Sequence, residues 1–255
     1  MGEFFADIHA TPDSQLRGTP CTVADTGEIA ALRGKQDYES LLQLAQALSF
    51  QLRYREAAEV YTKAIALKPN DRKAYRLRAA RYINSLRPSK AMADLLLCRE
   101  LGGDLVDLSY RIGLCLYLIG RYQWAMEEFE AAYSHSDEEM GIALIYWHTL
   151  SAWRCGADPK LLKHYRPNMR VGHHTGYHKA MSLAAGVTTW DVFWQNLAQE
   201  ATDLEFSIVA YGGCGYLAHR GKAEAAESLG KEIIRRDSFW ISYAYIAAWN
   251  DRFTK

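Results

Sequence analysis

Small and large apolar residues recur along the middle of the chain at a fixed spacing. When residues 38–71, 72–105 and 106–139 are written beneath one another without gaps, four of the 34 positions carry the same class of side chain in all three segments. The order small, small, large, small therefore occurs three times, which predicts a repeated structural unit. The eighth position holds Ala45, Ala79 and Gly113, the twentieth Ala57, Ala91 and Ala125, the twenty-fourth Tyr61, Leu95 and Phe129, and the twenty-seventh Ala64, Cys98 and Ala132.

The spacing of these positions is typical of antiparallel helix pairs. Two helices approach closely only where small side chains face each other, which explains the small residues at the eighth and twentieth positions. The large side chain at the twenty-fourth position fills the space between one pair and the next. Because a single pair cannot bury its own apolar faces, consecutive pairs are expected to stack into a solenoid.

Turn-forming residues lie where such helices would end. Residues 120–122 (Gly-Arg-Tyr) stand in the middle of the third segment, and residues 53–54 (Arg-Tyr) occupy the same place in the first. Pro69 is expected to stop the second helix of the first segment, because proline cannot continue a helix. Residues 102–103 (Gly-Gly) end the corresponding helix of the second segment.

These residues resemble the pattern of the tetratricopeptide repeat (TPR) family, which has small residues at positions eight, twenty and twenty-seven, Gly and Tyr at the turn, and Pro near the end. The second segment departs from it at Leu95 and Gly103, where the family prefers an aromatic residue and a proline. The resemblance implies an all-α fold, an α–α superhelix (TPR solenoid) of about ten to twelve helices, with three regular units in residues 36–139. It also implies binding of a protein or peptide, whereas the spacing itself indicates only stacked helix pairs.

A fifth, weaker unit is expected at residues 206–239. Gly213, Ala225 and Leu229 fall at its eighth, twentieth and twenty-fourth positions. Glu232 stands where a small residue is expected at the twenty-seventh position, so its helix is expected to lie farther from the neighbouring helix.

The last part of the chain predicts a closing helix. In residues 239–251 the apolar side chains gather on one face of a helix, so that residues 206–255 read as a TPR-like unit with a capping helix. The residues on that face are Trp240, Tyr243, Ile246 and Ala247.

Residues 140–205 are irregular and predict degenerate helical repeats. Residues 142–153 predict a helix, but in a register shifted from the earlier one, and the Gly- and His-rich residues 168–176 predict a loop. Thr189 is expected to cap a helix that runs to about residue 202. One or two degenerate helix pairs fit this segment equally well.

Residues 1–35 predict an extended N-terminal arm. Pro12 and Pro20 interrupt this segment, and a short helix is expected only at residues 27–33. An arm lying against the helices is the simplest arrangement. The sequence leaves open whether it occupies the groove of the solenoid.

Composition narrows the classes of partner and compartment. Lys and Arg equal Asp and Glu at 30 each, a balance that lacks the basic footprint of proteins that bind nucleic acid or anionic membranes. No apolar stretch approaches the length of a membrane-spanning helix. The 5 cysteines are widely spaced, which favours reduced thiols. We therefore expect a cytoplasmic protein with neither nucleic acid nor membrane as partner.

The groove of a TPR array is lined by the first helix of each pair, so polar and aromatic residues on that face are the candidates for peptide binding. Arginine and tyrosine can hold carboxylates and apolar side chains together. The predicted concave-face residues are Gln46, Lys73, Arg76, Asn84, Tyr110, Arg111 and Tyr117.

One known groove chemistry is excluded by the residues present. Some TPR proteins hold the C-terminal carboxylates of chaperones with a clamp of Lys, Asn and Arg residues. Of the matching positions only Arg111 keeps the required residue, and Asp107 would repel a carboxylate. The sequence therefore predicts a partner of another kind, an unknown protein or peptide.

Two alternatives from other classes remain open. Residues 140–205 hold a cluster of histidines (His164, His173, His174 and His178) together with Trp190 and Trp194, and a small-ligand or metal sensor, or an enzyme, would place its site there. The glycines and Pro167 between the histidines favour an unliganded loop, so no metal site is predicted. Self-association as a homo-oligomer is the second alternative. No catalytic or cofactor motif is present, which favours a non-enzymatic scaffold without cofactors.

Overall fold

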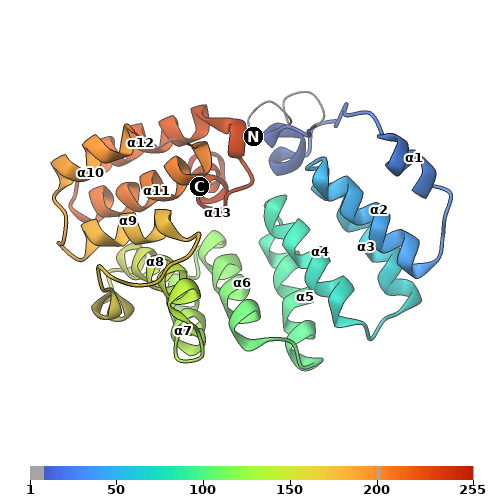
Figure 1. Cartoon of the computed structure of the whole chain (residues 1–255), viewed down its shortest axis with the longest axis horizontal. Coiled ribbons are helices and arrows are strands. Elements are labelled where there is room, and N and C mark those ends of the chain that lie inside the picture. Colours follow the sequence, from blue (N-terminus) through green and yellow to red (C-terminus); the bar gives the residue numbers. More distant parts are fainter. Residues whose placement is uncertain (1–8, 200–201, 255) are drawn as a thin grey trace. The chain divides into compact units, whose positions relative to one another are not determined.

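The computed structural model describes residues 9–199 and 202–254, and every regular element within them is a helix (Figure 1). This confirms the all-α prediction. Contacts divide the chain into two compact units, which we call unit 1 (up to Asp104) and unit 2 (from Leu105). The predicted segment of regular repeats, residues 36–139, spans the boundary between them. None of the described helices combines the length and apolar character needed to cross a membrane.

Unit 1 contains the arm followed by two long helix pairs. The arm includes one helical turn at Asp13–Arg17 and the short helix α1 (Gly27–Leu32). Within this unit each of the helices α1 to α4 packs against the next one in the chain. The pairs are α2 (Tyr38–Phe50) with α3 (Tyr54–Leu67), and α4 (Arg72–Asn84) with α5 (Pro88–Glu100).

Unit 2 starts with the third regular pair and continues with helices of unequal length. Short helical turns at Lys160–His164 and Asp237–Phe239 lie between them. The helices are α6 (Leu105–Leu118), α7 (Tyr122–Tyr133), α8 (Glu138–Cys155), α9 (Thr175–Ala184), α10 (Trp190–Leu197), α11 (Asp203–His219), α12 (Ala223–Arg235) and α13 (Tyr243–Phe253).

The helix boundaries reproduce the period of the sequence. The second helices of the three regular pairs begin at Tyr54, Pro88 and Tyr122, each 34 residues after the one before. The first helices α2 and α4 begin at Tyr38 and Arg72, which are also 34 residues apart. The predicted helix pairs with a 34-residue period are therefore confirmed for this part of the chain.

The small residues of the pattern lie where the helices touch. Ala45, Ala79, Ala57 and Ala91 are all 0% exposed. Within unit 2 the contact at the eighth position is closer still, because a Cβ atom on Gly113 would lie 2.4 Å from the ring of Phe129. Only glycine fits opposite that phenylalanine without a shift of the ring.

The turn inside each regular pair uses a left-handed backbone conformation. Leu52, Leu86 and Gly120 occupy the same repeat position and have φ angles of 58°, 53° and 77°. Glycine adopts this conformation without strain, whereas a leucine is strained in it, because its Cβ atom lies too close to a main-chain carbonyl oxygen. Two of the three turns are thus formed against local backbone preference.

The irregular segment 140–205 forms α8, α9 and α10 with a loop between α8 and α9. Helix α9 packs against both α8 and α11, and α10 packs against α9 and α11. Thr189 caps α10 by accepting a hydrogen bond from the main-chain nitrogen of Val192, as predicted from the sequence, but the helix ends at Leu197 and not near residue 202. The predicted loop at residues 168–176 extends only to His174, because α9 begins at Thr175.

The pair α11–α12, which corresponds to the predicted fifth unit, departs from the regular pattern more than the sequence suggests. Leu229 is buried as expected, but Ala225, at the twentieth position, is exposed, unlike the buried alanines of the regular pairs. In helix α12 only Leu229 and Ile233 are buried. One flank of this helix is therefore open to solvent.

Helix α13 does more than cap the end of the chain. It packs against α11 and α12, as a closing helix would, but it also reaches the first helix of unit 2. The hydroxyl of Tyr243 accepts a hydrogen bond from Arg111 at 2.7 Å, and the side-chain nitrogen of Asn250 donates to the carbonyl of Leu118 at 2.8 Å. The capping role predicted from the sequence is thus incomplete, because α13 lies along the inner face of α6.

The arm is fixed to the turn between α2 and α3. Ala10 donates its main-chain N–H to the carbonyl of Gln51 at 3.0 Å, and the side chain of Gln51 donates to the carbonyl of Ala24 at 3.1 Å. Arg55 donates both its main-chain N–H and its guanidinium to Gln15. The prediction of an extended arm is corrected by the helical turn that contains Gln15, whose side chain is buried.

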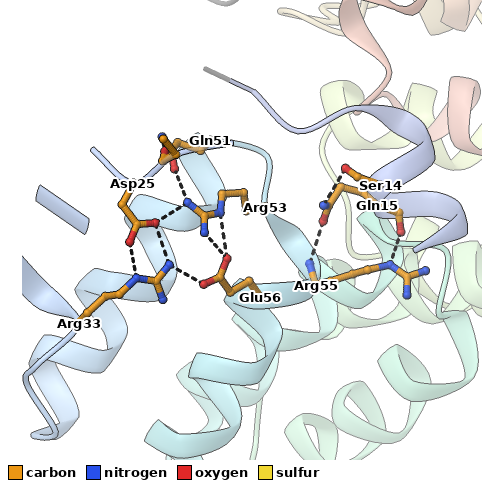
Figure 2. A network of polar contacts seen from close by, with 9 residues as sticks. Ser14, Gln15, Asp25, Arg33, Gln51, Arg53, Arg55 and Glu56 are labelled. Carbon is orange, nitrogen blue, oxygen red and sulfur yellow. Dashed lines mark hydrogen bonds and ion pairs between the residues drawn. The ribbon is translucent and has the colours of Figure 1, made fainter. Parts of the chain in front are cut away.

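A compact set of charges joins the arm to the same turn (Figure 2). Asp25 accepts hydrogen bonds from Arg33 and, at 2.6 Å, from Arg53, and Glu56 pairs with both arginines. The hydrogen bonds from Arg33 and then Arg53 hold the pKa of Asp25 well below its usual value. The described part of the arm is therefore held at the α2–α3 turn of unit 1.

Candidate functional site

The predicted groove residues of unit 1 differ in their accessibility. Gln46 on α2 and Lys73 on α4 are exposed, and Arg76, one turn after Lys73, is half-buried. Asn84 at the end of α4 is buried. Three of the four side chains predicted in this unit can therefore be reached from solvent.

The predicted groove residues of unit 2 contact other parts of the chain. Tyr110 is buried, and its hydroxyl lies 3.5 Å from that of Tyr177 on α9. Arg111 pairs with Asp107 at 3.0 Å and donates to Tyr243 on α13. These two residues therefore face α9 and α13 and not an open groove.

Tyr117, the third predicted residue of unit 2, begins a buried polar chain. Its hydroxyl lies 2.8 Å from that of Tyr211, which donates to Asp251 on α13 at 2.9 Å. Arg154 on α8 pairs with the same carboxylate. Burial raises the pKa of Tyr117 to about 12, so this hydroxyl remains protonated. The inner face of unit 2 is thus filled by the chain's own last helix.

An open cavity lies between α10, α11 and α12. We call it the tryptophan cavity; its volume is about 660 Å³. Its apolar lining is Trp190, Trp194, Leu197, Phe206, Leu217 and Leu229.

Stacked aromatic rings form one wall of the tryptophan cavity. The ring of Trp190 is parallel to that of Tyr216 within 5°, with centroids 6.1 Å apart, and it stacks on Trp194 on its own helix. Trp194 remains 50% exposed. The structure thus places Trp194 at the surface of a cavity and not in the core.

A basic rim adjoins this aromatic wall. Arg235 and Arg236 both pair with Glu232, and the guanidinium of Arg236 lies 3.8 Å from the ring centroid of Phe206. The hydrogen bond from Arg235 lowers the pKa of Glu232 to about 2, so the carboxylate is ionised at neutral pH. Lys231, also on the rim, pairs with Glu227 at 2.6 Å, so the positive excess of the rim comes from Arg235 and Arg236 against Glu232. Sequence reasoning missed these arginines, although they follow the unexpected Glu232 by three and four residues.

A second cavity of about 420 Å³ lies beside α13 and is lined in part by Arg154, Cys214 and Asp251. Burial raises the pKa of Cys214 to about 12, and that of Cys115 on α6 similarly. Both side chains are therefore thiols at neutral pH and lack the thiolate that nucleophilic catalysis needs.

The histidines of the irregular segment do not form one cluster. The ring of His164 stacks on Tyr133 at 5.0 Å between centroids, and that of His178 lies 4.9 Å from Tyr165. Only His173 and His174 lie next to each other, with centroids 4.3 Å apart.

Similarity to known proteins is found among solved structures. No family model matches the chain, and no curated protein matches it. Among solved structures the chain is similar to one described as "Crystal structure of YrrB: a TPR protein with an unusual peptide-binding site", with 15% sequence identity and a TM-score of 0.46 over 90% of this chain and 99% of that chain. The helix pairs themselves are defined by the helix boundaries and the buried small residues described above.

Proposed function

We propose that the chain is a scaffold that binds a peptide segment of a partner protein in the tryptophan cavity. The observation that carries this proposal is the half-exposed Trp194 beside the basic rim. Exposed apolar surface next to charged groups is characteristic of interaction sites. Tryptophan and arginine are also the residues that most often dominate the binding energy of protein interfaces.

The chemistry of the cavity favours one class of peptide. Its aromatic wall suits an apolar side chain, which would be buried against Trp190 and Trp194. Its rim has an excess of positive charge, because Glu232 offsets only one of the two charges of Arg235 and Arg236. A segment with an apolar anchor and neighbouring acidic residues is therefore the best complement.

The groove predicted from the sequence is proposed as a second contact surface. In unit 1, Gln46, Lys73 and Arg76 offer polar groups on the first helices of their pairs. In unit 2 the corresponding face is covered by α13. A partner that used Tyr110 or Arg111 would have to displace that helix.

The proposal is tested with a displayed peptide library and the full chain. Peptides that combine acidic and apolar residues are expected to be enriched, and their binding is expected to change tryptophan fluorescence. Trp194→Ala is expected to weaken binding by about 2 kcal/mol or more, the range of interface hot spots. Trp124→Ala is the matched control, because Trp124 is 56% exposed but lies on α7, away from the cavity.

The charge of the rim is tested separately. Arg235→Glu is expected to weaken acidic peptides, and Arg220→Glu, the same charge change at an exposed position outside the cavity lining, is expected to have little effect. Equal affinity of Trp194→Ala and the unaltered chain for every enriched peptide would refute the cavity as the site. Enrichment of basic peptides would refute the proposed class of partner.

A further inference from the structure

A carboxylate and two imidazoles converge where α8 and α9 begin. Glu139 lies in the first turn of α8, His174 directly precedes α9, and His173 comes just before it. Each residue offers one ligand atom, and these atoms all lie within 4.8 Å of one another. Nδ1 of His173 lies 2.5 Å from Oε1 of Glu139. Three potential metal ligands thus meet from two segments that are distant in sequence.

The orientation of His174 is fixed by a main-chain contact. Its Nδ1 lies 2.6 Å from the carbonyl oxygen of Glu139. Because a carbonyl only accepts hydrogen bonds, Nδ1 carries the proton, and the neutral ring has its lone pair on Nε2. Histidines that bind metals are held in the same way, with the second ring nitrogen donating to a carbonyl or carboxylate.

The neighbouring carboxylates Glu138 and Glu139 have different partners. Glu138 accepts hydrogen bonds from the Arg166 side chain at 2.5 Å and from the main-chain nitrogen of Arg170 at 2.8 Å. The carboxylate of Glu139 instead faces the turn before α9, so closely that a Cβ atom on Gly172 would lie 2.5 Å from its oxygens. Gly172 has a φ of +51°, which also favours glycine. The turn therefore seats the Glu139 carboxylate beside the two histidines.

We propose that Glu139, His173 and His174 form a binding site for a transition-metal ion, with Zn²⁺ as the ion best suited to two imidazoles and one carboxylate. The metal would replace the proton between His173 and Glu139. His173 can adjust to it at little cost, because its side chain is 82% exposed. Water would take the remaining coordination position of the metal ion. The site is separate from the tryptophan cavity and does not depend on the proposed peptide binding.

The site is tested by titrating the untagged full chain with Zn²⁺ in a calorimeter and with Co²⁺ in an absorption spectrometer. One ion per chain is expected to bind, and the Co²⁺ complex is expected to show the visible bands of a low-coordinate site. His174→Ala is expected to weaken Zn²⁺ binding at least about tenfold. His178→Ala is the matched control, since this histidine lies four residues further on and its ring contacts the carbonyl of Arg166 instead.

A second variant protects the test against misfolding. His173→Ala removes a mostly exposed side chain, so it is expected to preserve the fold and still to weaken Zn²⁺ binding about tenfold or more. Absence of Zn²⁺ binding by the unaltered chain would overturn the proposal. So would equal affinities of His173→Ala, His178→Ala and the unaltered chain, because binding would then be adventitious.

Discussion

Units 1 and 2 both begin with helix pairs of the same type, but the face of the first helix is accessible in unit 1 and covered in unit 2. In unit 1, α2–α5 keep the 34-residue spacing, and the first-helix residues Gln46 and Lys73 stay exposed. In unit 2 the regular pair α6–α7 is followed by further helices, of which α9, α10 and α13 have no counterpart in the repeat. Two of these helices cover the face of α6 that a regular array would leave open, with contacts to Tyr110 and Arg111.

The interiors differ along with the faces. The core of unit 1 consists mainly of leucine and alanine with a few tyrosines. In unit 2, Trp147 lies among the rings of Tyr117, Tyr146 and Tyr211. In unit 1 the first-helix residues thus remain accessible. In unit 2 the added helices cover the corresponding face of α6, and the tryptophan cavity lies elsewhere, between α10, α11 and α12.

The largest expected effect concerns the aromatic interior of unit 2. Trp147 is 0% exposed, and its ring lies 5.2 Å from those of Tyr117 and Tyr146 between centroids. Trp147→Ala is expected to lower the free energy of unfolding of unit 2 by about 3–5 kcal/mol. Residue-resolved hydrogen exchange measures this, and an equal loss of protection in α2–α5 would break the comparison between the two interiors.

The next effect tests the closest helix contact. Gly113→Ala places a Cβ atom 2.4 Å from the ring of Phe129 and is expected to destabilise unit 2 by about 1–3 kcal/mol in denaturant titrations. In unit 1 the same repeat position is Ala79, which is 0% exposed. Gly230→Ala is the control: nothing lies within 4 Å of its added methyl group, so stability should be unchanged or raised by up to about 1 kcal/mol. Destabilisation of equal size in both variants would exclude the contact as the cause.

A smaller effect is expected at the turn inside the third pair. Gly120 has a φ of 77°, and its added methyl group would meet no atom within 4 Å. Gly120→Ala is therefore expected to cost about 1 kcal/mol from backbone strain alone. Thermal unfolding measures this cost. An unchanged stability would show that Leu52 and Leu86 hold the same turn in unit 1 without strain.

The smallest effect concerns the charges that fix the arm in unit 1. Because the pKa of Asp25 is lower in the folded than in the unfolded chain, its ion pairs stabilise the fold above the unfolded pKa of about 3.9. This contribution is lost as the pH falls through the folded pKa. Asp25→Asn is expected to cost about 0.5–1 kcal/mol at neutral pH, after allowing for solvent screening, and little in strong acid. A cost independent of pH in denaturant titrations would contradict the ion-pair explanation.

The regular helix pairs could be predicted because their constraint acts within 34 residues. The small residues Ala57, Ala91 and Ala125 are required wherever two successive helices touch, so their spacing is written directly in the sequence. Ala225 holds the same position within residues 206–239 but is exposed, because position alone does not specify which flank of α12 is covered.

The candidate sites depend on contacts that have no local signature. Arg111 meets Tyr243 across 132 residues, and no periodic pattern links α6 to α13. The four-residue spacing of Trp190 and Trp194 is that of one helix face, but the exposure of Trp194 depends on where α12 lies. Glu139 and His173 come from a helix end and a loop, and the angle at which the loop returns to α8 cannot be inferred from residue types.

The path of α13 has a consequence for how unit 2 unfolds. In an open array each pair touches only its neighbours, so terminal pairs can melt while the others persist. Helix α13 bonds to α6 at the start of the unit and packs on α12 at its end, which links first and last elements in a closed circuit. Neither end can fray without breaking that circuit, and unit 2 should therefore melt in one cooperative step.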